Sequence, residues 1–452
     1  MTTTDSTAGT GCADTLDNGI PGLAQWYAAQ DIPSRQSLRA LADLLNNIPA
    51  RAENRDAFEA FLGRVMGAST LDLVSESHHL SGPTRVAAGL AIAELLTEHA
   101  PEIGPHSSRP ESPQWDTVTV GDDTFHFPTD LAFHCATVIP GLDAVVRISS
   151  SFRPGAHLEV FVRPADQVLG RELMQHIITR AEQLNIFRGR VLEATTGNFG
   201  LEFEIVNRPT SSRSKIIATD AIWDEIDLNV QAVSTHGDMM KDLGLGVRRG
   251  LLLAGPPGVG KSAITSVIAS ELAGPFTVVY CDSRSGASLL RNVFDECVRL
   301  GPSLVVIEDV DLIVGRRHGS NLSSHVLSEF LAALDSHPSA PLLVMATTND
   351  VTTLDSAAVR AARFDSIIEV PYPSPATTKQ ILEALLTEVP GSAQIDTAAV
   401  AAALPQNTNG ADIREIVRRA VLKSQPVTTQ AVLAQISGGR YRPTMPEVGN
   451  YL

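Results

Sequence analysis

The sequence has no apolar run close to the roughly 20 residues that a helix needs to cross a bilayer. Its first residues, MTTTDSTAGTGCADTLDNG, lack a basic segment and an apolar core, so we expect no secretory signal and a cytoplasmic protein. Cysteine is scarce, and Cys12, Cys135, Cys281 and Cys297 form no CxxC pair. We therefore expect reduced, packed thiols rather than disulfides or a zinc site.

Positive charge is also in short supply, with 35 Lys and Arg against 51 Asp and Glu, for a formal charge of −16. A surface of that sign repels phosphate backbones, so we expect no nucleic acid partner. The first 214 residues contain no lysine. Codon usage that favours arginine explains this skew, and so does a partner that tags lysines; taken alone, the skew favours codon usage.

Hydrophobic periodicity divides the chain into several expected segments. Apolar residues at i, i+3 and i+4 predict helices, and apolar strands that alternate with helices predict a parallel sheet. No heptad is sustained, so no coiled coil is expected. In order, we expect a disordered tail (1–30), a helical unit (31–100), a Pro/Ser linker (101–114), an α+β domain of unknown role (115–213), an α/β domain (214–372), a helical lid (373–438) and a flexible tail (439–452).

The stretch RGLLLAGPPGVGKS contains the pattern G-x-x-x-x-G-K-S between an apolar strand and a helical pattern, the context of a phosphate-binding loop. Its glycines allow backbone N–H groups to face phosphates, and the next helix adds its positive end. Lys261 should reach the β and γ phosphates, and the Ser262 hydroxyl should bind Mg²⁺. The expected nucleotide-binding residues are Gly255, Pro256, Pro257, Gly258, Val259, Gly260, Lys261 and Ser262.

Polar residues follow two further apolar strands. Glu308, Asp309 and Asp311 come at the end of SLVVI, and Asn349 comes at the end of LLVMATT. Ligands of parallel sheets bind at the carboxyl ends of the strands. The acidic pair there can hold Mg²⁺ and orient an attacking water, and Asn349 can hold that water near the γ-phosphate.

Arg360 and Arg363 follow in DSAAVRAARFD, three residues apart and on one side of a helical turn. They are either surface charges or fingers that reach a neighbouring subunit's γ-phosphate.

In this order the motifs resemble the ATPase module of the AAA family over residues 245–440. GPPGVGKS resembles its Walker A motif, VVIEDVD its Walker B motif, ATTND its sensor 1, DSAAVRAARFD its second region of homology, and NGADI its lid motif. The resemblance implies a P-loop NTPase (AAA+) α/β fold with a helical lid, and ATP and Mg²⁺ as cofactors. It also implies a homo-oligomeric ring, most often a hexamer, with Arg360 and Arg363 acting in trans. Asn349 would be the sensor, and Gly410 and Ala411 would approach the nucleotide from the lid.

Two features depart from the usual AAA pattern. Walker B usually reads Asp-Glu but here reads Glu308-Asp309, an order that also occurs in the AAA translocase of the Rieske protein and in related bacterial ATPases. By position, Glu308 would hold the metal and Asp309 would polarise water. Threading ATPases also carry an aromatic pore loop, but here no aromatic residue lies between Tyr280, expected in a strand, and Phe294, expected on a buried helix face. Residues 315–321 form either a second, basic pore loop or a solvated loop.

The last four residues, Gly449, Asn450, Tyr451 and Leu452, resemble the C-termini of proteasome-activating ATPases, which read GQYL in the mycobacterial proteasomal ATPases. Elsewhere the chain is more similar to actinobacterial AAA ATPases. The tail resemblance implies docking on the 20S proteasome core; a chance match in a disordered end is the alternative.

We therefore expect a ring-forming ATPase that remodels or unfolds a protein substrate and docks on the 20S proteasome. The missing pore aromatic favours a different function, an assembly or disassembly chaperone that acts without a protease. The inverted Walker B pair is the support for a third, a nucleotide-gated scaffold with little turnover.

Overall fold

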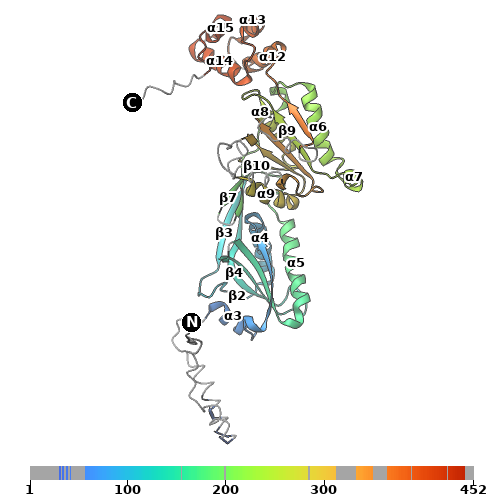
Figure 1. Ribbon diagram of the computed structural model, residues 1–452. Helices are drawn as coiled ribbons and strands as arrows, with labels where there is room; N and C mark the ends of the chain where they lie inside the picture. Colours follow the sequence, from blue (N-terminus) through green and yellow to red (C-terminus); the bar gives the residue numbers. More distant parts are fainter. Residues whose placement is uncertain are drawn as a thin grey trace, which may run out of the picture. The chain divides into compact units, whose positions relative to one another are not determined.

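The computed structural model describes residues 56–442, apart from 154, 198–199, 283–285, 312–331, 350–363, 388 and 425, together with isolated residues between 30 and 41. The chain divides into two compact units, Met1–Asp56 and Ala57–Leu452, and the elements below belong to the second unit (Figure 1). None of the helices in the described residues is long and apolar enough to span a membrane.

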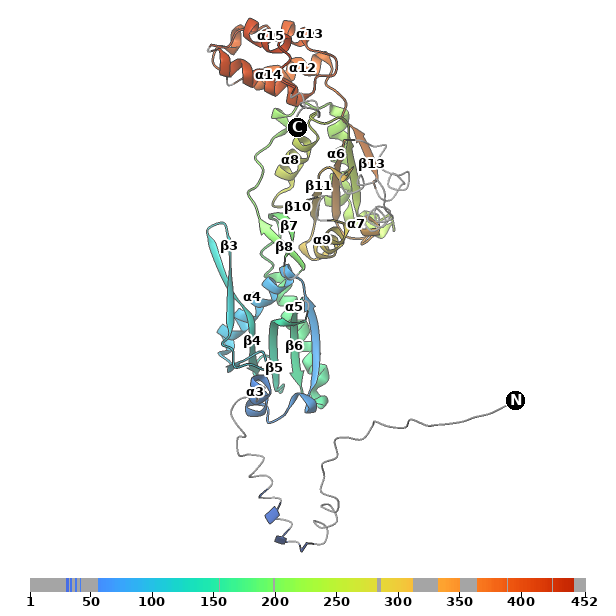
Figure 2. The ribbon, with the colours of Figure 1, turned by 60° about the vertical axis from the view of Figure 1, so that its left-hand side comes forward.

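The first half of this unit contains a six-stranded antiparallel sheet built around the long strand β4 (Figure 2). The strand order is β1 (Val74–Leu80), β6 (Gly155–Val162), β5 (Ala144–Arg153), β4 (Asp123–Cys135) and β2 (Ile103–Gly104), and β3 (Gln114–Val120) pairs with β4 off this path. The β3–β4 hairpin turns at Gly121 and Asp122.

Helices cover both faces of this sheet because side chains alternate along each strand. On one face, α4 (Gly82–His99) and α5 (Gln167–Gln183) pack against inward-facing residues such as Phe133 and Leu158. On the other face, α3 (Ala57–Val65) inserts Phe58 and Phe61 against Phe161. Short 3₁₀ helices lie at η1 (Thr70–Asp72), η2 (Pro164–Asp166), η3 (Arg213–Lys215) and η6 (Ser392–Gln394).

Two segments differ from the sequence-based expectation. Residues 31–100 were expected to be helical, but Val74–Leu80 is strand β1 and pairs with β6 along its whole length. This edge strand, VSESHHL, carries too few apolar residues for its period to be recognised. The expected linker 101–114 contributes β2 and buries His106 and Ser107, so it is part of the domain.

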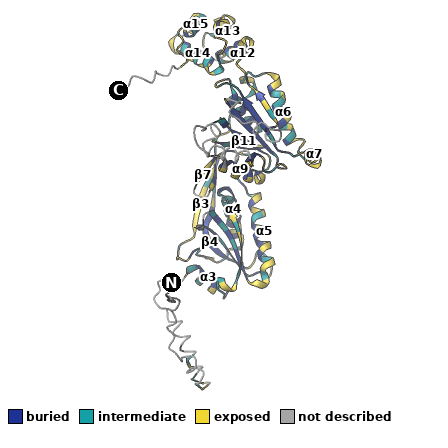
Figure 3. Ribbon diagram, in the orientation of Figure 1, coloured by how far each residue is buried: buried dark blue, intermediate teal, exposed yellow. Residues whose placement is uncertain are grey.

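The second sheet is parallel except for a hairpin at one edge. Its order is β13 (Ser366–Glu369), β9 (Arg249–Ala254), β12 (Leu342–Thr348), β11 (Ser303–Ile307), β10 (Thr277–Cys281), β7 (Val191–Gly197) and β8 (Gly200–Ile205). Its central strands, β9, β11 and β12, are buried almost throughout (Figure 3), because helices cover both faces. On one face lie α6 (Asp220–Ser234) and α8 (Lys261–Leu272), and on the other lies α9 (Gly286–Leu300). The short helix α7 (Gly237–Asp242) links α6 to β9.

The hairpin of β7 and β8 corrects the expected domain boundary. Both strands lie in the segment that was expected to form a separate α+β domain ending at residue 213. Instead β7 pairs in parallel with β10 through four residues from Val191 to Ala194, so the nucleotide-binding sheet starts well before residue 214. A strand's pattern indicates that it is a strand, but not which sheet it joins.

The lid is helical, as the sequence predicted, and the described residues form four helices. They are α12 (Pro375–Leu386), α13 (Thr397–Ala403), α14 (Gly410–Lys423) and α15 (Thr429–Ser437). The expected flexible tail from residue 439 is wrong in its first residues, because Tyr441 is only 7% exposed in the lid core. Arg442 donates to Asp412 of α14 at 2.8 Å, so the lid extends at least to residue 442.

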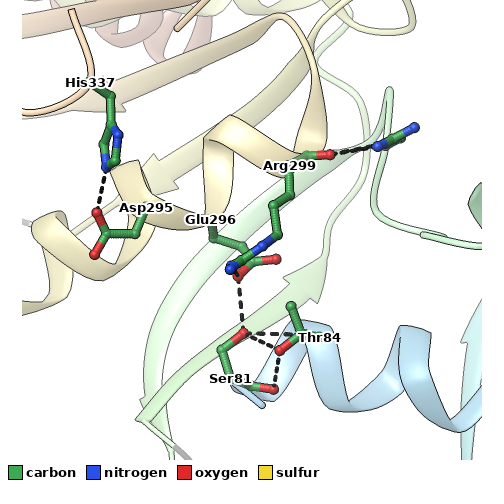
Figure 4. Close-up of polar contacts among 7 residues, drawn as sticks. Ser81, Thr84, Asp295, Glu296, Arg299 and His337 are labelled. Carbon is green, nitrogen blue, oxygen red and sulfur yellow. Dashed lines mark hydrogen bonds and ion pairs between the residues drawn. The ribbon is translucent and has the colours of Figure 1, made fainter. Parts of the chain in front are cut away.

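One buried carboxyl group links α9 to the helix that follows β1 (Figure 4). Glu296 is 1% exposed, and its Oε2 accepts from Ser81 Oγ at 3.0 Å and from Arg299 Nη1 at 3.3 Å. Ser81 is the N-cap residue of α4. Burial raises the pKa of Glu296, and Arg299 partly opposes that rise.

Candidate nucleotide-binding site

The loop between β9 and α8 depends on glycine at three positions. A Cβ on Gly255 would lie 2.1 Å from the carbonyl oxygen of Val370, so only glycine fits there. Gly258 (φ 79°) and Gly260 (φ 109°) have left-handed backbones that favour glycine. Helix α8 begins directly afterwards at Lys261 and has free N–H groups in its first turn. The loop and the helix end together form a site suited to an anion.

Lys261 is the first residue of α8, and its side chain is buried in the loop. The residue is 6% exposed, and Nζ donates to the carbonyl oxygens of Gly255 at 2.8 Å and Pro256 at 2.9 Å. Its third bond goes to Asn349 Oδ1, at 2.9 Å. The ammonium group is therefore fixed between the loop and the end of β12.

Asn349 also contacts the acidic segment after β11. Its Nδ2 donates to Asp309 Oδ1 at 3.0 Å, and Asp309 N donates to Thr347 Oγ1 at 3.0 Å. Asp309 has a left-handed backbone (φ 52°), which Asp tolerates better than most residues. Burial lowers the pKa of Lys261, while the carboxylates of Asp309 and Asp311 oppose this change and favour the charged amine.

Glu308 lies on a different side of the site from Asp309. Its Oε1 is 3.5 Å from Thr265 Oγ1, and the same hydroxyl lies 3.0 Å from the carbonyl oxygen of Ser262. Glu308 therefore faces the first turn of α8, where Ser262 is exposed. Burial raises the pKa of Tyr280 on the neighbouring strand, and the charge of Glu308 raises it further by a smaller amount.

The lid contacts the loop directly through the N-terminus of α14. Asn409 Nδ2 donates to the carbonyl oxygen of Pro257 at 3.0 Å, and Ala411 N donates to that of Gly258 at 3.1 Å. A Cβ on Gly258 would lie 2.8 Å from the Asn409 side chain, so this contact needs glycine. Gly410 and Ala411 thus lie against the loop that was expected to bind nucleotide.

The donor set fits a nucleoside triphosphate with Mg²⁺. The loop's N–H groups and Lys261 suit phosphate oxygens, and the Ser262 hydroxyl and the Glu308 carboxylate are oxygen ligands of the kind that Mg²⁺ prefers. Asp309 and Asn349 add a carboxylate and an amide, groups that can orient a water molecule. The described part of the chain brings all these residues to one edge of the sheet.

Other expected site residues lie outside the described residues. These are Arg360, Arg363, the basic segment 315–321 and the tail residues Gly449, Asn450, Tyr451 and Leu452. The two aromatic residues that flank the expected pore segment are described. Tyr280 is in β10 and Phe294 is fully buried in α9, as the sequence predicted.

Sequence reasoning missed Thr347 and Asn409 as contributors to the site. Thr347 holds the backbone of Asp309, and Asn409 caps α14 while bonding to the loop. Thr347 lies in the stretch ATTND, and Asn409 lies in NGADI. Asn409 directly precedes a helix and is followed three residues later by Asp412, which is the signature of a capping box. The cap was therefore recognisable in the sequence, whereas the contact of Thr347 was not.

The comparisons with known proteins agree with this geometry. Residues 251–372 match the ATPase family associated with various cellular activities (AAA). The chain is 28% identical over 232 residues to a proteasome-activating nucleotidase of Sulfurisphaera tokodaii, covering 48% of this chain and 58% of that protein. For the nucleotidase of Methanospirillum hungatei, the identity is 29% over 280 residues, covering 59% and 68%.

Another relative is named as a protease. The chain is 30% identical over 228 residues to the ATP-dependent zinc metalloprotease FtsH of Acidothermus cellulolyticus, covering 48% of this chain and 34% of that protein. The chain thus spans only part of the length of these relatives, 58% of the first nucleotidase. The stretch that matches the AAA family, residues 251–372, includes the loop, the acidic segment and the end of β12 described above. Residues 251–372 are accordingly an ATPase domain of the AAA family with the P-loop NTPase fold, a class of domain that hydrolyses ATP.

Proposed function

We propose that this chain is an ATP hydrolase whose catalytic site includes Lys261, Asp309 and Asn349. The observation that carries the proposal is the pair of contacts made by the Asn349 amide, with Lys261 Nζ at 2.9 Å and with Asp309 Oδ1 at 3.0 Å. A cation, an amide and a carboxylate at the carboxyl edge of a parallel sheet can bind a phosphate and orient water.

Each residue has a distinct role in this proposal. Lys261 and the loop N–H groups bind the β and γ phosphates, and Ser262 and Glu308 hold Mg²⁺, which neutralises phosphate charge when bound. Asp309 polarises the attacking water, and Asn349 orients it. The different partners of the two side chains, Thr265 for Glu308 and Asn349 for Asp309, support this division of the inverted Walker B pair.

Steady-state ATP hydrolysis by the wild type and by Lys261→Ala tests the proposal. We expect the variant to lose at least about 100-fold in rate, because a phosphate-binding cation is removed. Lys423→Ala, at the exposed end of α14, is the matched control and should keep the wild-type rate. Equal, negligible rates in the wild type and Lys261→Ala would favour the nucleotide-gated scaffold instead.

The second part of the proposal is a homo-oligomeric ring, most often a hexamer, in which Arg360 and Arg363 act at the neighbour's site. The match to the AAA family supports it. Subunits carrying Lys261→Ala can be co-assembled with subunits carrying both Arg360→Ala and Arg363→Ala. Each variant alone should be inactive, whereas mixed rings should regain activity where an intact arginine pair meets an intact lysine. Mixed rings without any recovery would contradict action in trans.

The third part concerns the substrate, which we propose is a protein that the ring unfolds or remodels in the cytoplasm. Relatives named proteasome-activating nucleotidase and ATP-dependent zinc metalloprotease support this class. Residues 449–452 are the proposed element for docking on the 20S core. Its test is a pull-down with 20S particles, using the full chain and a variant without these four residues. Binding that survives their removal, or no binding at all, rejects the docking.

A chaperone that acts without a protease is the second candidate. It is favoured by Tyr280 and Phe294, which lie in a strand and in a buried helix face and so leave no aromatic for a pore loop. Ring and core together can be given a folded fluorescent reporter with ATP. Loss of the signal supports unfolding for proteolysis, whereas a stable signal after confirmed docking supports remodelling.

A further inference from the structure

Asp311 contacts the end of β12 in a way that the roles assigned above do not use. Its Oδ1 accepts from the backbone N of Asn349 at 3.1 Å and from Thr348 Oγ1 at 3.1 Å. Both donors lie on β12 or directly after it, and Asp311 lies four residues after the end of β11. One carboxylate oxygen thus ties together the two segments that carry Asp309 and Asn349.

These two bonds matter because they fix the backbone at Asn349, whose side chain contacts Lys261 and Asp309. Asn349 is exposed at the end of its strand, whereas its neighbour Thr348 is fully buried. The Asn349 amide must nevertheless meet Lys261 on one side and Asp309 on the other. A small rotation of its backbone would break both contacts, and displacements of about 1 Å can cost 100-fold in rate.

We propose that Asp311 is a positioning residue, which holds Asn349 in the orientation that aligns the attacking water with Asp309. It acts through hydrogen bonds to the Asn349 backbone and the Thr348 hydroxyl, not through contact with substrate. This role rests on the proposed ATP hydrolysis, in which Asn349 orients the water.

An electrostatic role is the competing explanation, because the Asp311 charge also favours the protonated form of Lys261. The two explanations differ in what an amide does at position 311. Asp311→Asn keeps an acceptor oxygen for Asn349 and Thr348 but removes the charge. Asp311→Ala removes both the acceptor and the charge.

Steady-state kinetics of ATP hydrolysis on the assembled protein test the proposal. Asp311→Ala should lower kcat about 10- to 100-fold, as loss of an outer-shell partner does at other sites, with KM for ATP within about twofold. Asp311→Asn should recover most of that loss. The double variant Asp311→Ala/Asn349→Ala should be no slower than Asn349→Ala alone, because both changes remove the same function.

Three results would overturn the positioning role. They are an unchanged kcat in Asp311→Ala, equal losses in the Ala and Asn variants, and losses that multiply in the double variant. If Asp311→Ala fails to fold in a thermal unfolding assay, Asp311→Asn and Thr348→Val replace it. Asp311→Asn should keep most of the activity. Thr348→Val removes one of the two hydrogen bonds and should lower kcat with KM unchanged. A wild type without turnover would defeat the proposed function itself, which separates the two failures.

Discussion

Asn349 Nδ2 donates a hydrogen bond to Asp309 Oδ1 at 3.0 Å, although the two residues stand 40 positions apart in the chain. They meet because β11 and β12 are parallel neighbours, with Ile307 paired to Ala346 near their carboxyl ends. The contact gives Asp309, the second residue of the Glu308-Asp309 pair, a specific neighbour. In the proposed mechanism, this bond holds the carboxylate of Asp309 beside the amide that orients the attacking water.

Removing the amide should therefore slow hydrolysis without preventing nucleotide binding. We expect Asn349→Ala to lower kcat about 100-fold, the usual cost of one oriented polar group in a catalytic site. Binding of ATP, measured by isothermal titration, should change much less, because Lys261 keeps its two loop carbonyl contacts. Asn407→Ala, on the exposed lid loop, is the control and should keep the wild-type rate. Equal losses of binding and of rate in Asn349→Ala would contradict the assignment.

Gly255→Ala should damage the loop through the backbone. The new Cβ would lie 2.1 Å from the carbonyl oxygen of Val370, so β13 or the loop must move. We expect the free energy of unfolding to fall by about 1–3 kcal/mol and ATP binding to weaken. Gly63→Ala in α3 is the matched control, because nothing lies within 4 Å of its Cβ. It should raise the free energy of unfolding by about 0.5 kcal/mol. A Gly255→Ala protein with wild-type stability and binding would show that the close approach is not real.

Asn409 should affect nucleotide binding as well as stability. Asn409→Ala removes the N-cap of α14 and the bond to Pro257, and should cost about 1 kcal/mol of unfolding free energy. Asp396→Ala removes the cap of α13, where Asp396 Oδ1 accepts from Ala399 N at 3.0 Å, and should cost a similar amount. Only Asn409→Ala should also raise the Kd for ATP, since Asp396 is no part of the loop contact. Equal Kd values in the two variants would count against a lid that shapes the site.

Glu296 predicts a pH dependence of stability with a definite sign. Burial raises its pKa in the folded state above the ordinary value of 4.5, which also describes the unfolded chain. Its stabilising effect is therefore complete below about pH 4.5 and is lost as pH rises through the folded-state pKa. Glu296→Gln keeps an acceptor for Ser81 but cannot ionise.

As pH rises from about 4.5, the free energy of unfolding of Glu296→Gln should therefore increase relative to that of the wild type. Urea titrations at several pH values measure this difference, and Glu98→Gln, an exposed residue of the neighbouring α4, is the control. Arg299 and Asp295 also face Glu296, and their interactions with its charge are part of the difference that is measured. A difference between the two proteins that does not vary with pH would refute the prediction.

Local motifs made the grouping of the candidate site residues predictable, because G-x-x-x-x-G-K-S and the residues that follow apolar strands depend on short-range patterns. The strand order β9, β12, β11, β10 then brings Lys261, Asp309 and Asn349 together. What the sequence did not reveal depends on pairing between distant segments. The sequence pattern of β7 and β8 does not indicate which sheet they belong to. Only the pairing of β7 with β10 assigns the hairpin to the second sheet. Likewise, Thr347 is an ordinary polar residue in the sequence, and only its hydrogen bond to the Asp309 backbone gives it a place in the site.

The most direct test of the account is a single turnover of prebound ATP in Asp309→Asn. This variant keeps a side chain of the same size, so the contact with Asn349 can persist while the carboxylate that polarises water is lost. With Mg²⁺ present, we expect ATP to remain bound and phosphate release to fall at least about 100-fold below the wild-type rate. Phosphate release at the wild-type rate would contradict the central claim, because the reaction would then proceed without the Asp309 carboxylate.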